Sequence, residues 1–338
     1  MEEDPWLDRF EVVTYRRVST LADILFPRRV PTQTMLRQIG ERLNLPADAE
    51  FFSSTGFMTR LEADRLLYPR DAAYAKILKR QLSWLDFRRL KILNLNLDTA
   101  VLADVWTDFV DFERRSQTEI PFLLEQLAEF DKPKVLDACL GSGATSIGLK
   151  LAGIEDVVSN EIDGDFVRVA EMEARKHGVN LDVREYNWMD FGREYRGQFD
   201  AVTCTGNSIT YLFKRREQLR ALRNFKDSLK QGRKLIIDER NYDDHFLNGK
   251  YRYSGEIVYC GKDKVDAHPI HISDSMVVMG YHHLETGQKA HLVLYPFKRG
   301  ELRVLLEEAG FRDIEVFGDY KRDFKPEDSE FITYICRK

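Results

Sequence analysis

Several features that would point to other classes of protein are missing from this chain of 338 residues. Its four cysteines show no C-x-x-C spacing, so we expect reduced thiols in the cytoplasm. No apolar run approaches the roughly 18 residues that a membrane span requires, and the acidic residues after Met1 do not resemble a secretory leader. The net charge of −5 argues against nucleic acid as an obligatory partner, because phosphate binding needs a basic face.

The region from residue 135 to residue 161 carries the strongest signal in the sequence. An apolar strand at 134–138 contains Asp137 and enters a turn with Gly141 and Gly143, an apolar helix follows, and a second strand ends at Glu161. Glycines at such a turn let backbone N–H groups approach a ligand, and a terminal acid can accept both hydroxyls of a ribose. We therefore expect half of a nucleotide-binding βαβ unit, with a plain turn that binds nothing as the alternative.

The details of this turn indicate which adenosine cofactor fits. Ser146 stands where the dinucleotide fingerprint G-x-G-x-x-G has its third glycine. Asp137, four residues before Gly141, would repel a pyrophosphate but attracts an ammonium or a sulfonium group. S-adenosylmethionine (SAM) carries both of these charges, so the sequence favours SAM over a dinucleotide.

From residue 133 onward, strand patterns alternate with helical patterns. Such alternation predicts a parallel sheet with helices on both faces, and ligands of such sheets bind at the carboxyl ends of the strands. The expected strands are 134–138, 157–161, 182–186, 199–205 and 234–240, with further strands at 291–295, 314–317 and 331–336. The expected helices are 144–152, 165–176, 216–230 and 300–309.

Residues 1–104 form a separate, mostly helical pattern. Apolar residues recur at helical spacing over residues 32–43 and 71–93. The region carries 16 Lys and Arg against 15 Asp and Glu, so it has no basic face for nucleic acid. We expect a helical N-terminal domain that serves dimerisation or forms a lid, followed by the cofactor-binding domain at 105–338.

Residues 105–338 resemble the class I SAM-dependent methyltransferases, and among them the glycine and glycine/sarcosine N-methyltransferases. The sequence G-N-S at 206–208 follows one expected strand, and I-D-E-R-N-Y-D at 237–243 ends the next. Together these motifs are more specific than the glycine turn. The resemblance implies a Rossmann-like methyltransferase fold and SAM as the cofactor.

The resemblance also assigns roles to individual residues. It implies that SAM is held by Arg115, Asp137, Cys139, Gly141, Gly143, Glu161, Asn187, Trp188 and Thr205. It implies that the acceptor's carboxylate is received by Asn207 and Arg240, and that the pocket wall includes Tyr242, Tyr259 and Tyr295. Thr205 stands where the family usually has leucine, Cys139 occupies the first small motif position, and Phe109 replaces an expected tyrosine.

Structural explanations compete with these roles. Arg240 could form an ion pair with Asp238 or Asp243 instead of anchoring an acceptor. Asn207 could simply stabilise a turn, as Asn commonly does. Trp188 could belong to the core instead of forming a platform for adenine.

The function that these residues predict is N-methylation of a small amino acid such as glycine or sarcosine. Transfer to a sulfur, oxygen or carbon atom of another small carboxylic acid is the alternative, and an inactive SAM-binding regulator is a third possibility. We expect no metal site, because the histidines at 268, 271, 282 and 283 fall in a polar region that we expect to be a loop. A serine hydrolase is unsupported because the chain has no G-x-S-x-G motif.

Overall fold

The computed structural model describes residues 99–247 and 264–338. The chain divides into two compact units, and the second begins at Thr99. Helix α7 (Thr99–Phe109) runs across the expected domain boundary at 104/105, so residues 99–104 belong to the second unit. The helices expected at 32–43 and 71–93 lie outside the described residues, as does Tyr259.

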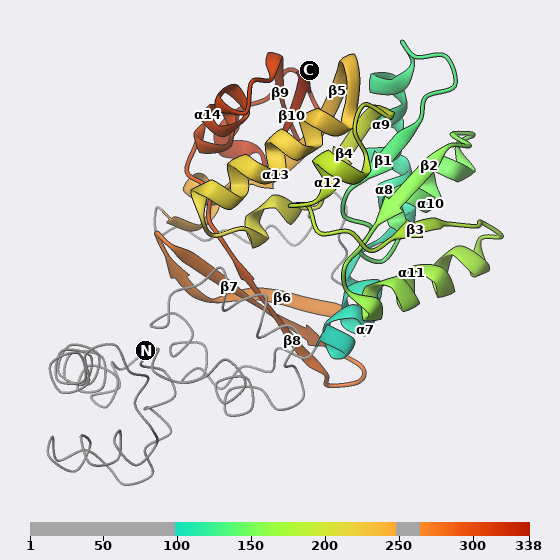
Figure 1. The fold of residues 1–338 in the computed structure, drawn as a ribbon. Helices are drawn as coiled ribbons and strands as arrows, with labels where there is room; N and C mark the ends of the chain where they lie inside the picture. The colour runs from blue at the N-terminus through green and yellow to red at the C-terminus, as the bar shows by residue number, and fades with distance from the viewer. Residues whose placement is uncertain (1–98, 248–263) are drawn as a thin grey trace, which may run out of the picture. The chain divides into compact units, whose positions relative to one another are not determined.

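A sheet of seven strands forms the centre of the described unit (Figure 1). Its spatial order is β3 (Asp182–Arg184), β2 (Val157–Asn160), β1 (Val135–Asp137), β4 (Phe199–Cys204), β5 (Leu229–Arg240), β10 (Phe331–Arg337) and β9 (Arg312–Gly318). The first five are parallel, as expected, whereas β10 runs antiparallel to both of its neighbours. Consequently β1, β4 and β5 lie next to one another, and their carboxyl ends meet at one edge.

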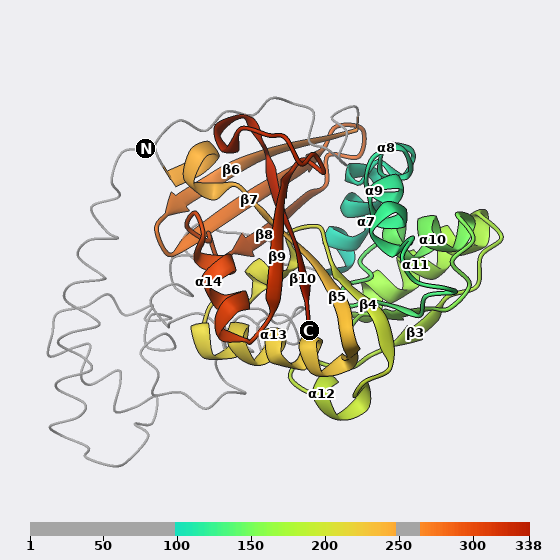
Figure 2. The same cartoon turned by 90° about the horizontal axis from the view of Figure 1, so that it is seen from above.

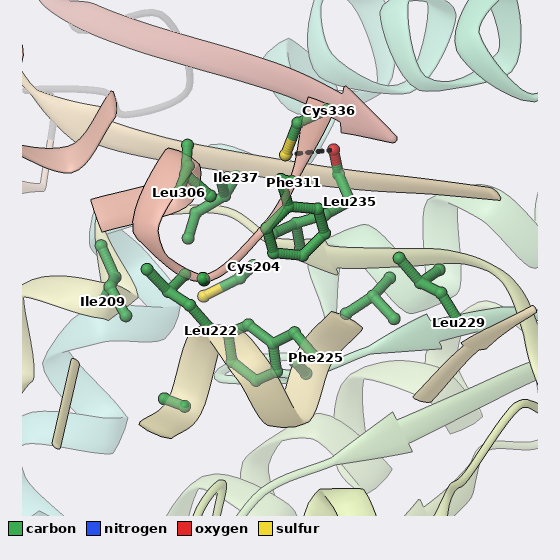
Figure 3. Close-up of a cluster of buried hydrophobic side chains, with 14 of the residues drawn as sticks. Cys204, Ile209, Leu222, Phe225, Leu229, Leu235, Ile237, Leu306, Phe311 and Cys336 are labelled. Carbon is green, nitrogen blue, oxygen red and sulfur yellow. Dashed lines mark hydrogen bonds between the residues drawn. The ribbon is translucent and has the colours of Figure 1, made fainter. Parts of the chain in front are cut away.

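Helices cover both faces of this sheet, and alternate residues of each strand face opposite cores. Leu235 and Ile237 join one cluster with α13 and α14, whereas Ile236 joins a second cluster with α9. Figure 3 shows the first cluster, in which Leu222 and Phe225 pack near Cys204. The helices are α8 (Phe112–Gln117), α9 (Glu119–Leu127), α10 (Ala144–Leu151), α11 (Gly164–Lys176), α12 (Phe191–Glu194), α13 (Arg215–Ser228) and α14 (Glu301–Glu308).

A second, antiparallel sheet was not expected. It consists of β6 (Val265–Ser273), β7 (Met276–His283) and β8 (Lys289–Leu294), and Figure 2 shows it beside α7. The expectation of a loop around the four histidines was therefore wrong. The histidines interrupt the apolar pattern, but β6 and β7 form a hairpin whose inward side chains, such as Val265 and Val277, are buried against α7.

Some element bounds also differ from those expected. The helix expected at 216–230 ends at Ser228, and β5 begins at Leu229 instead of residue 234, because Leu229 already pairs with Phe199. Short helical segments complete the described part: η3 (Ser208–Tyr211), η4 (Asp243–Leu247) and η5 (Pro326–Asp328). No helix within residues 99–247 and 264–338 has the length and apolarity that crossing a bilayer requires.

Candidate active site

The turn after β1 is shaped by two glycines in left-handed conformations. Gly141 has φ +53° and Gly143 has φ +91°, which other residues adopt only with strain. No atom lies within 4 Å of the position that a Cβ of Gly141 would take, so open space adjoins the backbone there. A Cβ on Gly143 would lie 3.0 Å from Ile147 Cδ1 and 3.2 Å from Ala170 Cβ. Gly143 therefore permits close packing, while Gly141 leaves room for a ligand.

Asp137 is a fully buried carboxylate at the end of β1. Its Oδ2 accepts a hydrogen bond from Ser146 Oγ at 2.7 Å, and its Oδ1 accepts one from Cys139 N at 3.3 Å. Burial raises the pKa of Asp137 to about 6, although these bonds and Arg115 oppose the shift. A positive group placed beside the turn would restore the charged form, so the site suits a cationic ligand.

Glu161 follows the end of β2 and reaches back to the same turn. Its Oε2 accepts from Gly141 N at 3.1 Å, and its Oε1 accepts from Ile162 N at 2.8 Å and Asp163 N at 3.1 Å. Burial raises the pKa of Glu161 to about 7, against the effect of these three bonds. Glu161 is therefore attached to the backbone of the glycine turn, and its role at a ribose stays a prediction.

Arg115 lies behind the turn, in a buried network with other side chains. Its Nε donates to Glu119 Oε2 at 2.7 Å, and its Nη2 donates to Thr145 Oγ1 at 2.8 Å. Both partners are buried, which fixes the guanidinium next to the first turn of α10. Arg115 is therefore a preorganised cation beside this turn, and its contact with the cofactor stays a prediction.

Trp188 and Asn187 follow β3. The indole Nε1 of Trp188 donates to Ala138 O at 2.7 Å, and its ring contacts Phe225 edge-on at 5.4 Å. Trp188 thus packs against the core, as the structural explanation required, and also borders the end of β1. Asn187 is exposed and its side-chain oxygen accepts from Met189 N at 3.0 Å.

Cys139 and Thr205 connect the ends of β1 and β4. The Cys139 thiol donates to Thr205 O at 3.3 Å. Thr205 is buried, and its hydroxyl donates to Glu119 Oε1 at 3.2 Å. Both residues therefore lie between the glycine turn and the G-N-S segment.

Asn207 and Arg240 are held directly against each other. Asn207 has a left-handed backbone (φ +67°), its Oδ1 accepts from Arg240 N at 2.9 Å, and its Nδ2 donates to Tyr242 OH at 2.8 Å. Asp238 fixes the same turn, because its carboxylate accepts from Gly206 N and Asn207 N. Asn207 therefore stabilises a turn, as the structural explanation held, and joins the ends of β4 and β5.

The guanidinium of Arg240 pairs with neither of the acids that the sequence suggested. Its Nη2 lies 3.4 Å from Glu330 Oε2, and its Cζ lies over the rings of Phe246 and Phe331, 4.8 and 5.9 Å from their centroids. Asp238 instead binds backbone N–H groups, and Asp243 accepts from Arg299 N. The expected structural partners of Arg240 were therefore wrong, and Glu330 takes that place.

A small pocket opens beside Asn207 and Arg240. Neither Tyr242 nor Tyr295 is among its lining residues, which are Trp106, Phe109, Gly206, Asn207, Tyr211, Arg240, Tyr281, Leu292, Leu294 and Phe331. Tyr242 is buried behind Asn207, and the Tyr295 hydroxyl donates to Glu301 at 2.7 Å. The sequence does not point to Tyr281, because a loop is expected where β7 lies. It does not point to Tyr211 either, because a single tyrosine in the short segment after β4 gives no signal.

Comparisons with known proteins agree with this geometry. Residues 135–232 match a family model described as a methyltransferase domain. The chain is 32% identical to a glycine/sarcosine N-methyltransferase of Halorhodospira halochloris over 70% of its length and 86% of the relative's. It is 36% identical to a glycine/sarcosine N-methyltransferase of Parasynechococcus marenigrum, over 70% of this chain and 82% of that protein. The chain belongs to the glycine/sarcosine N-methyltransferase family.

Membership in this family makes the chain a SAM-dependent methyltransferase and confirms the expected cofactor. The fold agrees: a SAM-dependent methyltransferase from Clostridium acetobutylicum superimposes with a TM-score of 0.53 at 17% identity, over 68% of this chain and 92% of the other. The open space at Gly141 and the buried acids fit SAM. Within the described part of the chain, no group of three or more His, Cys, Asp or Glu side chains could hold a metal ion.

Proposed function

We propose that the protein transfers the methyl group of SAM to the nitrogen of glycine or sarcosine. The observation that carries this proposal is the joining of Asn207 and Arg240 in one pocket at the carboxyl ends of β4 and β5. A guanidinium offers a planar fork that matches a carboxylate, with charge-assisted hydrogen bonds. The names of the curated relatives support glycine and sarcosine as the acceptors.

SAM supplies an activated methyl group, so the protein's own task is to hold the acceptor in line and its nitrogen unprotonated. Positioning alone can contribute about 7–11 kcal/mol to such a reaction. No carboxylate is among the described residues that line the pocket, whereas Arg240 is. An apolar wall and a nearby cation both lower the pKa of a bound amine, which favours its neutral, nucleophilic form.

The roles of the other residues follow from the same arrangement. We assign Asp137 and Arg115 to the methionine end of SAM, Glu161 to its ribose, and Asn187 with Trp188 to the border of its adenine. Tyr242 supports the acceptor anchor through its contact with the Asn207 amide. Burial raises the pKa of Tyr242 to about 12, so it remains a neutral phenol at physiological pH.

Incubation with SAM and a panel of small acids tests the proposal. Formation of S-adenosylhomocysteine and of methylated product should occur with glycine or sarcosine and fail with their amides. Turnover confined to a thioether or hydroxy acid would move the reaction to another nucleophile. SAM binding without any turnover across the panel would instead indicate a regulator.

A further inference from the structure

Glu119 is the centre of a buried polar network that no assigned role explains. Its side chain is completely buried at the start of α9. Besides Arg115, it accepts hydrogen bonds from Thr145 Oγ1 at 2.7 Å, Thr205 Oγ1 at 3.2 Å and Tyr320 OH at 3.3 Å. A buried carboxylate with this many donors is held rigidly, and the loss of one donor changes the strength of the remaining hydrogen bonds.

The donors come from segments that serve different ligands. Thr145 is the second residue of α10, two positions after Gly143, on the cofactor side. Thr205 lies directly before Gly206 and Asn207, on the acceptor side. Both hydroxyls donate to the same atom, Glu119 Oε1, so a single carboxylate oxygen connects the two sides.

Thr205 is the residue that makes this connection possible. At this position the resemblance leads us to expect leucine, which has no hydroxyl to donate. The Thr205 hydroxyl also accepts a long hydrogen bond of 3.5 Å from Arg115 Nη2. It therefore touches both members of the Arg115–Glu119 ion pair.

Electrostatic interactions link the cofactor side to the turn at residues 206–207 in a second way. Burial raises the pKa of Asp238 to about 7, and the negative charge of Glu119 adds to the shift, while the bonds from Asn207 and Gly206 and the charge of Arg115 oppose it. In its ionised form Asp238 holds the N–H groups of both residues more strongly. A cationic ligand near Asp137 would favour that ionised form.

We propose that Thr205 and Glu119 are positioning residues that couple the two sites, so that an occupied cofactor site strengthens acceptor binding at Asn207 and Arg240. The coupling rests on the proposed function only for the identity of the acceptor. It is reciprocal, because the acceptor must strengthen cofactor binding by the same factor. Direct contact through Glu119 carries it, and no rearrangement of the fold is required.

Calorimetry on the full chain tests the coupling with S-adenosylhomocysteine as the cofactor-site ligand. Glycine and sarcosine should bind the wild-type protein at least about fivefold more tightly when S-adenosylhomocysteine is present. Thr205→Val keeps the shape of the side chain but removes the hydroxyl, so this ratio should fall towards one. Thr205→Ser keeps the hydroxyl and should retain most of it.

Thr203→Val is the matched control. Thr203 is equally buried on β4, but its hydroxyl donates to Leu136 O instead of Glu119. This variant should keep the wild-type ratio. An unchanged ratio in Thr205→Val, or an equal loss in Thr203→Val, would overturn the proposal.

Hydrogen exchange separates this inference from the proposed function. S-adenosylhomocysteine alone should slow amide exchange at residues 206–207 in the wild type and in Thr205→Ser, and clearly less in Thr205→Val. If neither glycine nor sarcosine binds, the proposed function is wrong, yet the exchange measurement still decides whether the coupling exists. Equal slowing in all variants would refute it.

Discussion

At the scale of single residues, Arg240 offers the sharpest test of the acceptor site. Its backbone N–H is fixed by Asn207, whereas its guanidinium lies near Glu330 and over the rings of Phe246 and Phe331. Arg240→Lys keeps the charge but loses the planar fork, so the acceptor KM should rise strongly while SAM affinity stays near wild type. Steady-state kinetics with calorimetry of SAM measures both quantities.

A double comparison decides whether Arg240 contacts the acceptor's carboxylate. Amidating the acceptor should cost the wild type about as much activity as the mutation does, and should cost the variant little more. A purely structural Arg240 would instead lower thermal stability, weaken both ligands and leave the sensitivity to amidation intact. Equal loss of SAM and acceptor binding would remove Arg240 from the acceptor site.

Glu161 tests the cofactor assignment in the same way. Glu161→Ala should weaken SAM binding by about 1–3 kcal/mol, because charge-assisted bonds to the ribose are lost. Glu161→Gln preserves the shape and should lose less. Titration calorimetry gives the two affinities, and an unchanged value in Glu161→Ala would place the ribose elsewhere.

Glu239 makes the stability of the apoprotein depend on pH. Burial raises its pKa from 4.5 to about 8, despite the hydrogen bond from Tyr334 OH at 2.8 Å. The folded state therefore keeps a proton that the unfolded chain loses, and the protonated Glu239 contributes to the free energy of unfolding. This contribution is fully present below about pH 4.5 and is lost as the pH rises through about 8.

Urea unfolding at pH 5.5 and pH 8.5 measures this effect. In Glu239→Gln the fall in the free energy of unfolding between these two pH values should be smaller than in the wild type, by on the order of 1–3 kcal/mol. The exposed Glu185→Gln should fall as the wild type does. The same fall in Glu239→Gln and the wild type would show that Glu239 is already ionised at low pH.

At the scale of elements, α7 links the acceptor pocket to the antiparallel sheet. It contributes Trp106 and Phe109 to the pocket, and Asp108 attaches it to His283 at 3.0 Å and Lys264 at 2.7 Å. Asp108→Ala should loosen the helix and raise the acceptor KM by about threefold to tenfold, with little change in SAM affinity. On the same helix, Asp104→Ala removes an exposed pair with Arg168 and should have little effect. Equal kinetics in the two variants would contradict a role for this attachment.

The elements also show what the sequence could and could not predict. The strands around Asp137, Glu161 and Asn207 were predicted because apolar runs bounded by glycines and acids give a local signal. The hairpin of β6 and β7 was missed because its burial depends on α7, which is distant in sequence. Glu330 as the partner of Arg240 could not be inferred either, since antiparallel pairing of β10 with β5 brings them together across 90 residues.

At the scale of the whole molecule, residues 1–98 form the first of the two compact units. The expectation of a dimerisation domain or lid was drawn for residues 1–104, but residues 99–104 belong to α7 and to the second unit. A deletion should therefore end at Asp98. A cut after residue 104 would break α7, and a longer cut would also remove the pocket residues Trp106 and Phe109.

We predict that deletion of residues 1–98 changes the oligomeric state or the acceptor affinity while SAM binding persists. The glycine turn, Asp137 and Glu161 all lie in the second unit, which has its own hydrophobic cores. Light scattering gives the mass of the full and shortened chains, calorimetry gives SAM affinity, and kinetics gives the acceptor KM. A shortened protein with the same mass state per subunit and full activity would refute both a dimerisation role and a lid. Loss of SAM binding as well would show that the second unit does not fold alone, and would contradict the assignment of a separate N-terminal domain.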